Sequence, residues 1–156
     1  MAEMISAHIL KEEARCKDNC GRANFTKSYK RKWEHMRAMI QEHYGRTRPV
    51  YNTNLRPNRN GGNRCKHQNR VAKGAGRSKH RNWVKESGVW GGIAGDWCCD
   101  GMSQGELAWW GRKAGFKGIG IYRSNVHLDD RKTKRVVKWG PGTFRKPKRV
   151  TSGSGP

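Results

Sequence analysis

Apolar side chains recur at helical spacing in one long segment of the chain. The residues of this stripe follow one another at steps of three or four: Tyr29, Trp33, Met36, Ile40 and Tyr44. Such spacing places them on one face of an α-helix, with Thr26 as a suitable N-cap and Gly45 as a natural stop. We therefore predict a helix here, and we expect its apolar face to pack into the core rather than to bind a cofactor.

A second helix and several short strands are predicted further along. Ser103 and Glu106 have the spacing of a capping box, ahead of a helix that continues to Ala114 and ends at Gly115. Segments rich in β-branched or aromatic residues favour strands over residues 50–55, 118–122 and 125–129. This uneven order predicts an α+β fold, with an antiparallel sheet packed against two or more helices and a zinc site on the sheet.

A chain of 156 residues fits one small domain. We assign this domain to residues 1–139, with basic loops over 56–68 and 81–91. Residues 140–156 are basic and rich in Gly, Ser and Pro, so we expect a flexible tail whose last six residues, from Thr151, are disordered.

The charge balance is extreme, because Lys and Arg give the chain a formal net charge of +22. Such a field attracts polyanions: nucleic acid, anionic cell-wall polymers, acidic lipid surfaces or an acidic partner protein. No acidic residue occurs between Glu42 and Glu86, while Lys and Arg recur throughout that stretch. We interpret the stretch as one basic face or loop.

The sequence gives no sign of a membrane span or of a secretory signal. No apolar run approaches the roughly 20 residues that a spanning helix needs, and the N-terminus lacks a positive start followed by an apolar stretch. An odd number of cysteines leaves at least one unpaired or favours a reducing compartment. We expect synthesis in the cytoplasm as a soluble chain. One candidate for a structural zinc site is the group of Cys16, Cys20 and Cys65, with or without His67. The alternatives are buried packing of these cysteines or a disulfide.

Three residues are candidate ligands of a catalytic metal: His80, Asp96 and His127. Zinc hydrolases use three His or carboxylate ligands and leave the fourth position open. Each residue also has a structural interpretation, because His80 can be solvated or capping, Asp96 can belong to a turn, and His127 can be a half-buried strand residue. Spacing alone leaves both interpretations open.

Short motifs around these residues follow one another in a fixed order. They are Ser78-Lys79-His80, Gly92-Ile93-Ala94-Gly95-Asp96, Phe116–Tyr122, Val126-His127-Leu128-Asp129 and Trp139. The order resembles that of the zinc D-Ala-D-Ala carboxypeptidase and endopeptidase family, over nearly the whole chain from Glu13 to Trp139. The resemblance implies one zinc ion bound by His80, Asp96 and His127.

The same resemblance implies an arginine that holds a substrate carboxylate or stabilises a developing oxyanion. We assign this role to Arg56, at the end of the predicted strand, with Arg64 as the alternative because an extra loop over 57–63 shifts the register. Either can instead be an ordinary surface arginine. Ser78 is assigned to substrate binding.

The chain departs from the family pattern in two places. Eleven residues separate His80 from Gly92, so the segment 81–91 must loop out, anchored by Trp83 and Trp90 or using them to line a substrate groove. The position of the usual general base holds Ser124 and Asn125, neither of which takes a proton from water. Asp129 is the nearest candidate base, and its competing role is to orient His127.

The resemblance implies zinc-dependent hydrolysis of peptidoglycan stem-peptide amide bonds, by an endopeptidase or a D,D-carboxypeptidase. We expect a phage-type lytic enzyme that acts at the bacterial cell wall, as a monomer unless it belongs to a virion. Its partners would be peptidoglycan, anionic envelope polymers and, through the basic stretch and tail, nucleic acid. The alternative is an inactive zinc-binding virion protein or a basic nucleic-acid-binding protein.

Overall fold

The computed structural model describes residues 2–18 and 20–150 and has an α+β fold, as predicted. The central sheet has five strands in the order β1-β4-β6-β5-β7. Neighbouring strands are antiparallel, except that β7 runs parallel to β5 at one edge. The strands span Val50–Asn52 (β1), Ala94–Cys99 (β4), Gly118–Ile121 (β5), Val126–Asp129 (β6) and Val137–Trp139 (β7).

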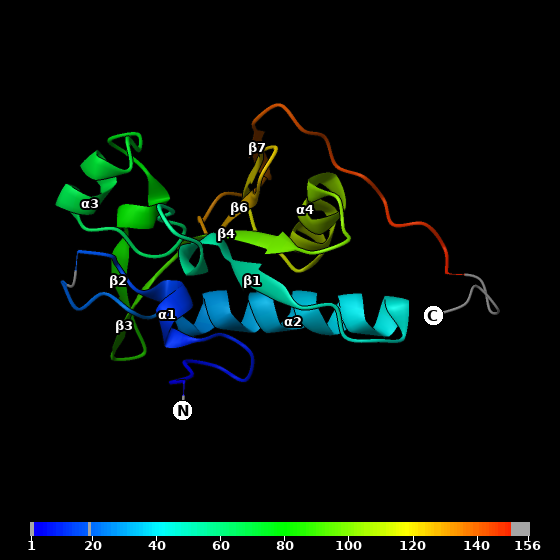
Figure 1. Cartoon of the computed structure of the whole chain (residues 1–156), viewed down its shortest axis with the longest axis horizontal. Helices are drawn as coiled ribbons and strands as arrows, with labels where there is room; N and C mark the ends of the chain where they lie inside the picture. The colour runs from blue at the N-terminus through cyan, green and yellow to red at the C-terminus, as the bar shows by residue number, and fades with distance from the viewer. Residues whose placement is uncertain (1, 19, 151–156) are drawn as a thin grey trace.

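Two helices cover one face of this sheet (Figure 1). Helix α2 (Lys27–Tyr44) begins at the predicted cap, where the Thr26 hydroxyl accepts a hydrogen bond from the Tyr29 N–H, and it ends at Gly45 in the left-handed region, φ 66°. Helix α4 (Gln104–Lys113) begins at Ser103, which accepts from the Glu106 N–H. Only this half of the predicted capping box forms. The Glu106 carboxylate accepts hydrogen bonds from side chains of α2 and α4 rather than from the Ser103 N–H.

The core lies between these helices and the sheet. Trp33 of α2 and Trp97 of β4 are both fully buried, with ring centroids 5.1 Å apart. The Trp97 indole N–H donates to the Tyr29 hydroxyl, which donates in turn to the Leu128 carbonyl. Burial of such side chains stabilises a fold by roughly 1.5–3 kcal/mol each. The predicted apolar stripe of α2 is therefore core.

Two expected loops contain regular structure. Residues 81–91 hold most of a β-hairpin, formed by β2 (Trp83–Glu86) and β3 (Val89–Gly92), with positive φ at the turn residues Ser87 and Gly88. The basic loop over 56–68 runs into a short helix, α3 (Lys66–Val71). The other short elements are α1 (Lys11–Ala14) and the 3₁₀ turns η1 (Thr53–Leu55) and η2 (Lys79–Arg81).

The strand predicted over 50–55 is shorter than expected. It ends at Asn52, whose side-chain oxygen accepts a hydrogen bond from the Asn54 N–H. This local bond competes with strand pairing and turns the chain into η1.

The segment after β7 also differs from expectation. It forms neither helix nor strand up to residue 150, yet the Gly142 N–H donates to the Ile121 carbonyl and the Arg145 N–H donates to the Gly105 carbonyl. Phe144 packs against the core, and the segment passes α4 in Figure 1. Residues 140–145 are thus docked on the domain instead of free, and the predicted disorder over 151–156 lies outside the described residues.

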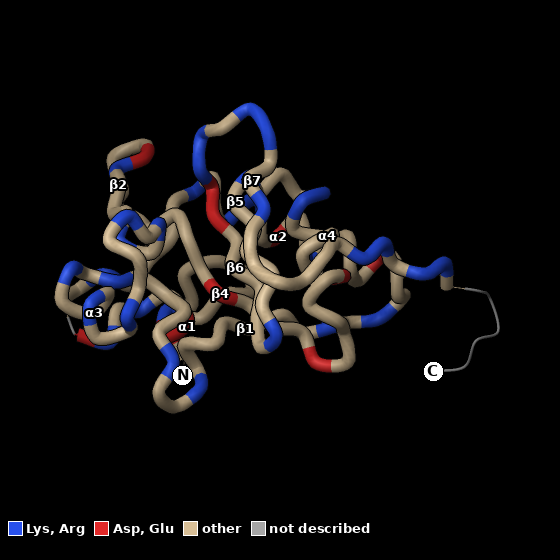
Figure 2. The backbone as a smooth tube through the Cα atoms, turned by 90° about the horizontal axis from the view of Figure 1, so that it is seen from above, with Lys and Arg blue, Asp and Glu red and all other residues tan. Residues whose placement is uncertain are grey.

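Basic residues are spread over the surface rather than gathered in one stretch (Figure 2). They mark α3 and the turns around it, and also the loop that leads from β6 to β7. Among the helices described, none has the length and apolar character needed to cross a membrane.

Candidate metal centre

Strand pairing brings two of the predicted ligands together. Asp96 of β4 and His127 of β6 are direct partners in the antiparallel register, so their side chains lie on the same face of the sheet. Asp96 Oδ1 is 3.2 Å from His127 Nδ1. Their neighbours Trp97 and Val126 are also partners and point into the core. The alternation of the strands thus separates a polar site from the apolar face.

The third predicted ligand arrives from the turn η2. His80 Nε2 lies 3.1 Å from Asp96 Oδ1 and 3.1 Å from His127 Nδ1. The ligand atoms of the three residues all lie within 4.8 Å of one another, which allows them to share one metal ion. The structure therefore brings together His80, Asp96 and His127, as the sequence predicts.

Hydrogen bonds on the far side of each imidazole fix the two rings. The outer nitrogen of His80, Nδ1, lies 2.8 Å from the Gly62 carbonyl, and that of His127, Nε2, lies 2.7 Å from Asp129 Oδ2. We assign the ring protons to these outer nitrogens, because the carbonyl and the carboxylate both accept. The inner nitrogens then present lone pairs to the shared space, an arrangement typical of metal-binding histidines.

Asp129 lies behind His127. It is completely buried and accepts hydrogen bonds of 2.8 Å from Nε and from a terminal nitrogen of Arg131. Burial would raise the pKa of the Asp129 carboxyl, but the Arg131 and His127 contacts hold it well below its usual range. This geometry favours the orienting role of Asp129 over the role of a base that reaches water.

The three candidate ligands have shifted pKa values. Burial lowers the pKa of His80, against the opposing effect of Asp96. Burial also acts to lower the pKa of His127, but its hydrogen bonds with Asp129 and Asp96 outweigh that effect and raise it. Burial acts to raise the pKa of Asp96, yet the two imidazoles hold it far below its usual range, so this carboxylate is ionised.

A pocket of about 610 Å³ opens beside the three candidate ligands. Its wall includes Ser78, which the sequence assigned to substrate binding, and six cationic side chains: Arg59, Arg64, Lys73, Arg77, Lys79 and Arg131. Within the part of the chain that the structure describes, Asp96 is the one carboxylate in this wall. The pocket is therefore suited to an anionic ligand.

Of the two arginines weighed from the sequence, the alternative is the one at the site. Arg64 is largely buried and lies 3.6 Å from Asp96 Oδ2. Arg56, the first choice, instead contacts the Tyr51 hydroxyl and ring and lines a separate hollow. The choice of Arg56 is corrected to Arg64, because the loop over 57–63 carries the chain back across β4, where the Asp96 N–H donates to the Gly61 carbonyl.

The aromatic side of the pocket was not predicted from the sequence. Trp139 of β7 lies with its ring centroid 5.0 Å from that of His127, and its indole N–H donates to the Tyr122 hydroxyl at 2.5 Å. Gly120 lies between His127 and Trp139 in the register and leaves room for this contact. The Gly-Ile-Gly alternation of β5 was the available signal, since a glycine within a strand often marks a close approach.

Comparisons with known proteins give no further assignment. No family model matches the chain, and neither the curated proteins nor the solved structures contain a match.

Proposed function

We propose that this protein is a zinc-dependent peptidase that hydrolyses amide bonds in peptidoglycan stem peptides. The observation that carries the proposal is the convergence of His80, Asp96 and His127 beside an open pocket. Their order along the chain, which resembles that of the zinc D-Ala-D-Ala peptidases, supports the choice of reaction. The site of action would be the bacterial cell wall, reached by a phage-type lytic protein.

The residues fit zinc by their chemistry. Two imidazole nitrogens and one carboxylate oxygen are ligands that catalytic zinc sites use, and the pocket provides room for the open fourth position. When bound, zinc supplies Lewis acidity that polarises a carbonyl and activates water near neutral pH.

The surrounding side chains take distinct roles in this proposal. The Arg64 guanidinium, next to Asp96, is suited to hold a substrate carboxylate or the oxygen that gains charge in the transition state. Asp129 keeps the His127 ring in place. Ser78 and the cations of the wall would hold acidic groups of the substrate.

The test is hydrolysis of purified peptidoglycan by the zinc-loaded protein, followed through newly released amino groups and mass spectrometry of the products. We expect release by the native chain and a loss of at least about a thousandfold in His80→Ala. His35→Ala, which changes an exposed histidine of α2, is the matched control and should remain active. A native protein with zinc at the His80 site that releases nothing, while a known endopeptidase does, contradicts the proposal.

A second candidate function is supported by the makeup of the pocket wall. Among the described residues, six cations line the pocket and Asp96 is its one carboxylate, a composition that also suits an anion-binding protein that holds zinc without catalysis. In that case DNA binding would fall steeply with salt, would persist in His80→Ala, and would accompany a native protein without hydrolytic activity.

A further inference from the structure

A second group of metal-ligating side chains lies away from the pocket. The sulfur atoms of Cys16, Cys20 and Cys65 all lie within 4.8 Å of one another, and the three cysteines are free thiols. Zinc–sulfur bonds of about 2.3 Å place the sulfurs of a tetrahedral site roughly 3.8 Å apart. The three thiols thus lie at nearly the spacing that one zinc ion requires. A disulfide would pair only two of these cysteines and leave the third one free.

Backbone N–H groups point at these sulfurs. The Cys65 N–H donates to Cys16 Sγ at 3.4 Å, and the Gln68 N–H donates to Cys65 Sγ at 3.4 Å. Such donors stabilise negative charge on sulfur, so they fit thiolates that bind a cation.

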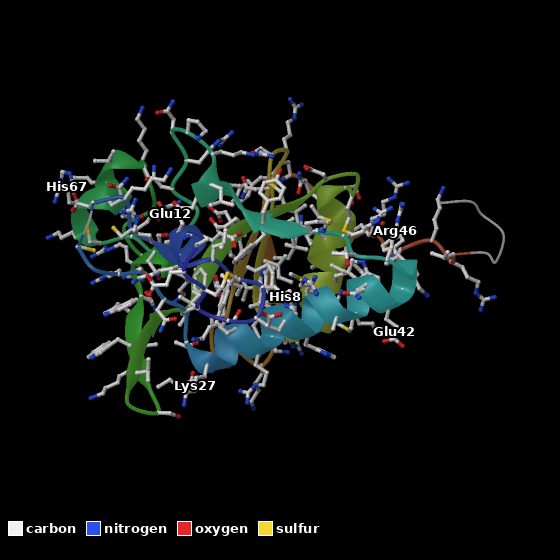
Figure 3. The ribbon with its side chains drawn as sticks, turned by 60° about the horizontal axis from the view of Figure 1, so that its bottom comes forward. His8, Glu12, Lys27, Glu42, Arg46 and His67 are labelled. Atoms are coloured by element: carbon white, nitrogen blue, oxygen red, sulfur yellow. The ribbon has the colours of Figure 1, made fainter. Side chains whose placement is uncertain are left out.

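His67 lies two residues after Cys65, at the end of the molecule that carries α3 (Figure 3). Its Nε2 is 4.0 Å from Asp18 Oδ1, and the other oxygen of that carboxylate is 3.1 Å from Cys65 Sγ. The exposed imidazole thus lies beside a carboxylate that contacts one of the sulfurs, and three Cys with one His is a common set of ligands in structural zinc sites.

We propose that Cys16, Cys20 and Cys65 bind a structural zinc ion and that His67 completes its coordination. The role of a reactive nucleophile suits Cys16 poorly, because burial raises the pKa of its thiol to about 11. Metal binding displaces this proton, as in other thiolate sites.

The ion would join two segments that support the pocket. Arg22, just after the first two cysteines, donates to the carbonyls of Arg64 and Arg81 at 3.0 and 2.9 Å. Asn63 donates through its backbone N–H to the Ala14 carbonyl at 2.9 Å. Holding the turn at Cys16 against Cys65 therefore fixes the backbone on both sides of Arg64, whatever reaction the pocket performs.

The test is metal content of the full chain, purified under reducing conditions and loaded with zinc. We expect two ions per chain in the native protein and one each in Cys16→Ser, Cys65→Ser and His80→Ala. Cys98→Ser, a cysteine outside the group, should keep both. With cobalt in place of zinc, the intense near-ultraviolet thiolate-to-cobalt band should persist in His80→Ala and vanish in Cys65→Ser. This readout separates the cysteine site from the proposed peptidase.

Two further measurements test the proposal even if a serine variant does not fold. In the native protein, a chelator should increase the alkylation rate of the three thiols at least tenfold, and His67→Ala should lower zinc affinity at this site at least tenfold. A reduced native chain whose cobalt form lacks the thiolate band, or whose three thiols alkylate equally fast with and without zinc, overturns the proposal. Unchanged affinity in His67→Ala overturns the assignment of the fourth ligand.

Discussion

The two candidate metal sites of this protein are built in different ways. At the first, Asp96 and His127 are cross-strand partners in the sheet, and only His80 comes from a turn. At the second, Cys16, Cys20 and Cys65 come from loops and the end of a short helix, held by hydrogen bonds between backbone and sulfur. At the first site, strand pairing fixes the positions of two candidate ligands. At the second site, no sheet does so, and the positions of the cysteines depend on their own hydrogen bonds and on any bound ion.

Outside the three candidate metal ligands, the largest expected effect concerns Arg64, which lies beside Asp96 of the first site and directly precedes Cys65 of the second. We expect Arg64→Ala to lower kcat for peptidoglycan hydrolysis by about 10²–10³-fold, the effect typical of losing one donor to a developing oxyanion. The thiolate-to-cobalt band should remain. Arg56→Ala is the matched control, and equal losses in both variants would show that the effect is not local to the pocket.

The second effect concerns the residue behind His127. Asp129→Asn keeps the size of the side chain but removes the charge that holds the imidazole, so we expect zinc affinity at the His80 site to fall about 10–100-fold. Affinity at the cysteine site should not change, and competition with a chelator measures both. Asp100→Asn, at an exposed aspartate, serves as the control. An unchanged affinity in Asp129→Asn would mean that Asp129 does not support the metal site.

The third effect is a difference in pH dependence. Because the pKa of His127 is raised, this ring binds a proton in the metal-free protein below that raised value, and zinc must displace it. Affinity at the His80 site should therefore rise with pH, at most about tenfold per unit for one proton, and level off above the raised pKa. The cysteine site releases protons from thiols and should keep gaining affinity at higher pH. If zinc affinity depends on pH in the same way at both sites, the predicted difference between them is wrong.

The smallest effect tests the gap between His127 and Trp139. A Cβ at Gly120 would lie 2.7 Å from Trp139 Nε1, so Gly120→Ala must displace a side chain at the edge strand β7. We expect a loss of about 1 kcal/mol in the free energy of unfolding, near the low end for overpacking, because Trp139 can move. Denaturant unfolding measures this loss. Metal content should stay the same, and a lost ion would show that Trp139 shapes the site.

Much of the fold was predictable where local signals agree with packing. The apolar stripe from Tyr29 to Ile40 has helical spacing and is buried on one face of α2. The spacing and the capping residues both predicted this helix. The hairpin β2–β3 was missed because its residues are largely exposed, which leaves no apolar alternation to detect. The tail was predicted as flexible from composition, although the partly buried side chain of Phe144 holds it against the core.

The candidate metal centre was predictable only in part. Its ligands were located through the motif order, and the strand containing His127 was predicted from β propensity. The pairing of His127 with Asp96 could not be deduced, because register is a tertiary property. For the same reason Arg56 was preferred over Arg64. Bringing Arg64 to Asp96 requires the chain to turn back after η1, and no local pattern specifies that path.

The shared register of β4 and β6 also protects the ligand pair against slippage. A shift of one residue between these strands would pair Asp96 with a core side chain, and it would turn the large indole of Trp97 away from its contact with Trp33. Misplacing the polar pair would thus expose several buried apolar side chains at once. The β2–β3 hairpin lies outside this sheet, while the register of β4 and β6 keeps carboxylate and imidazole opposite one another.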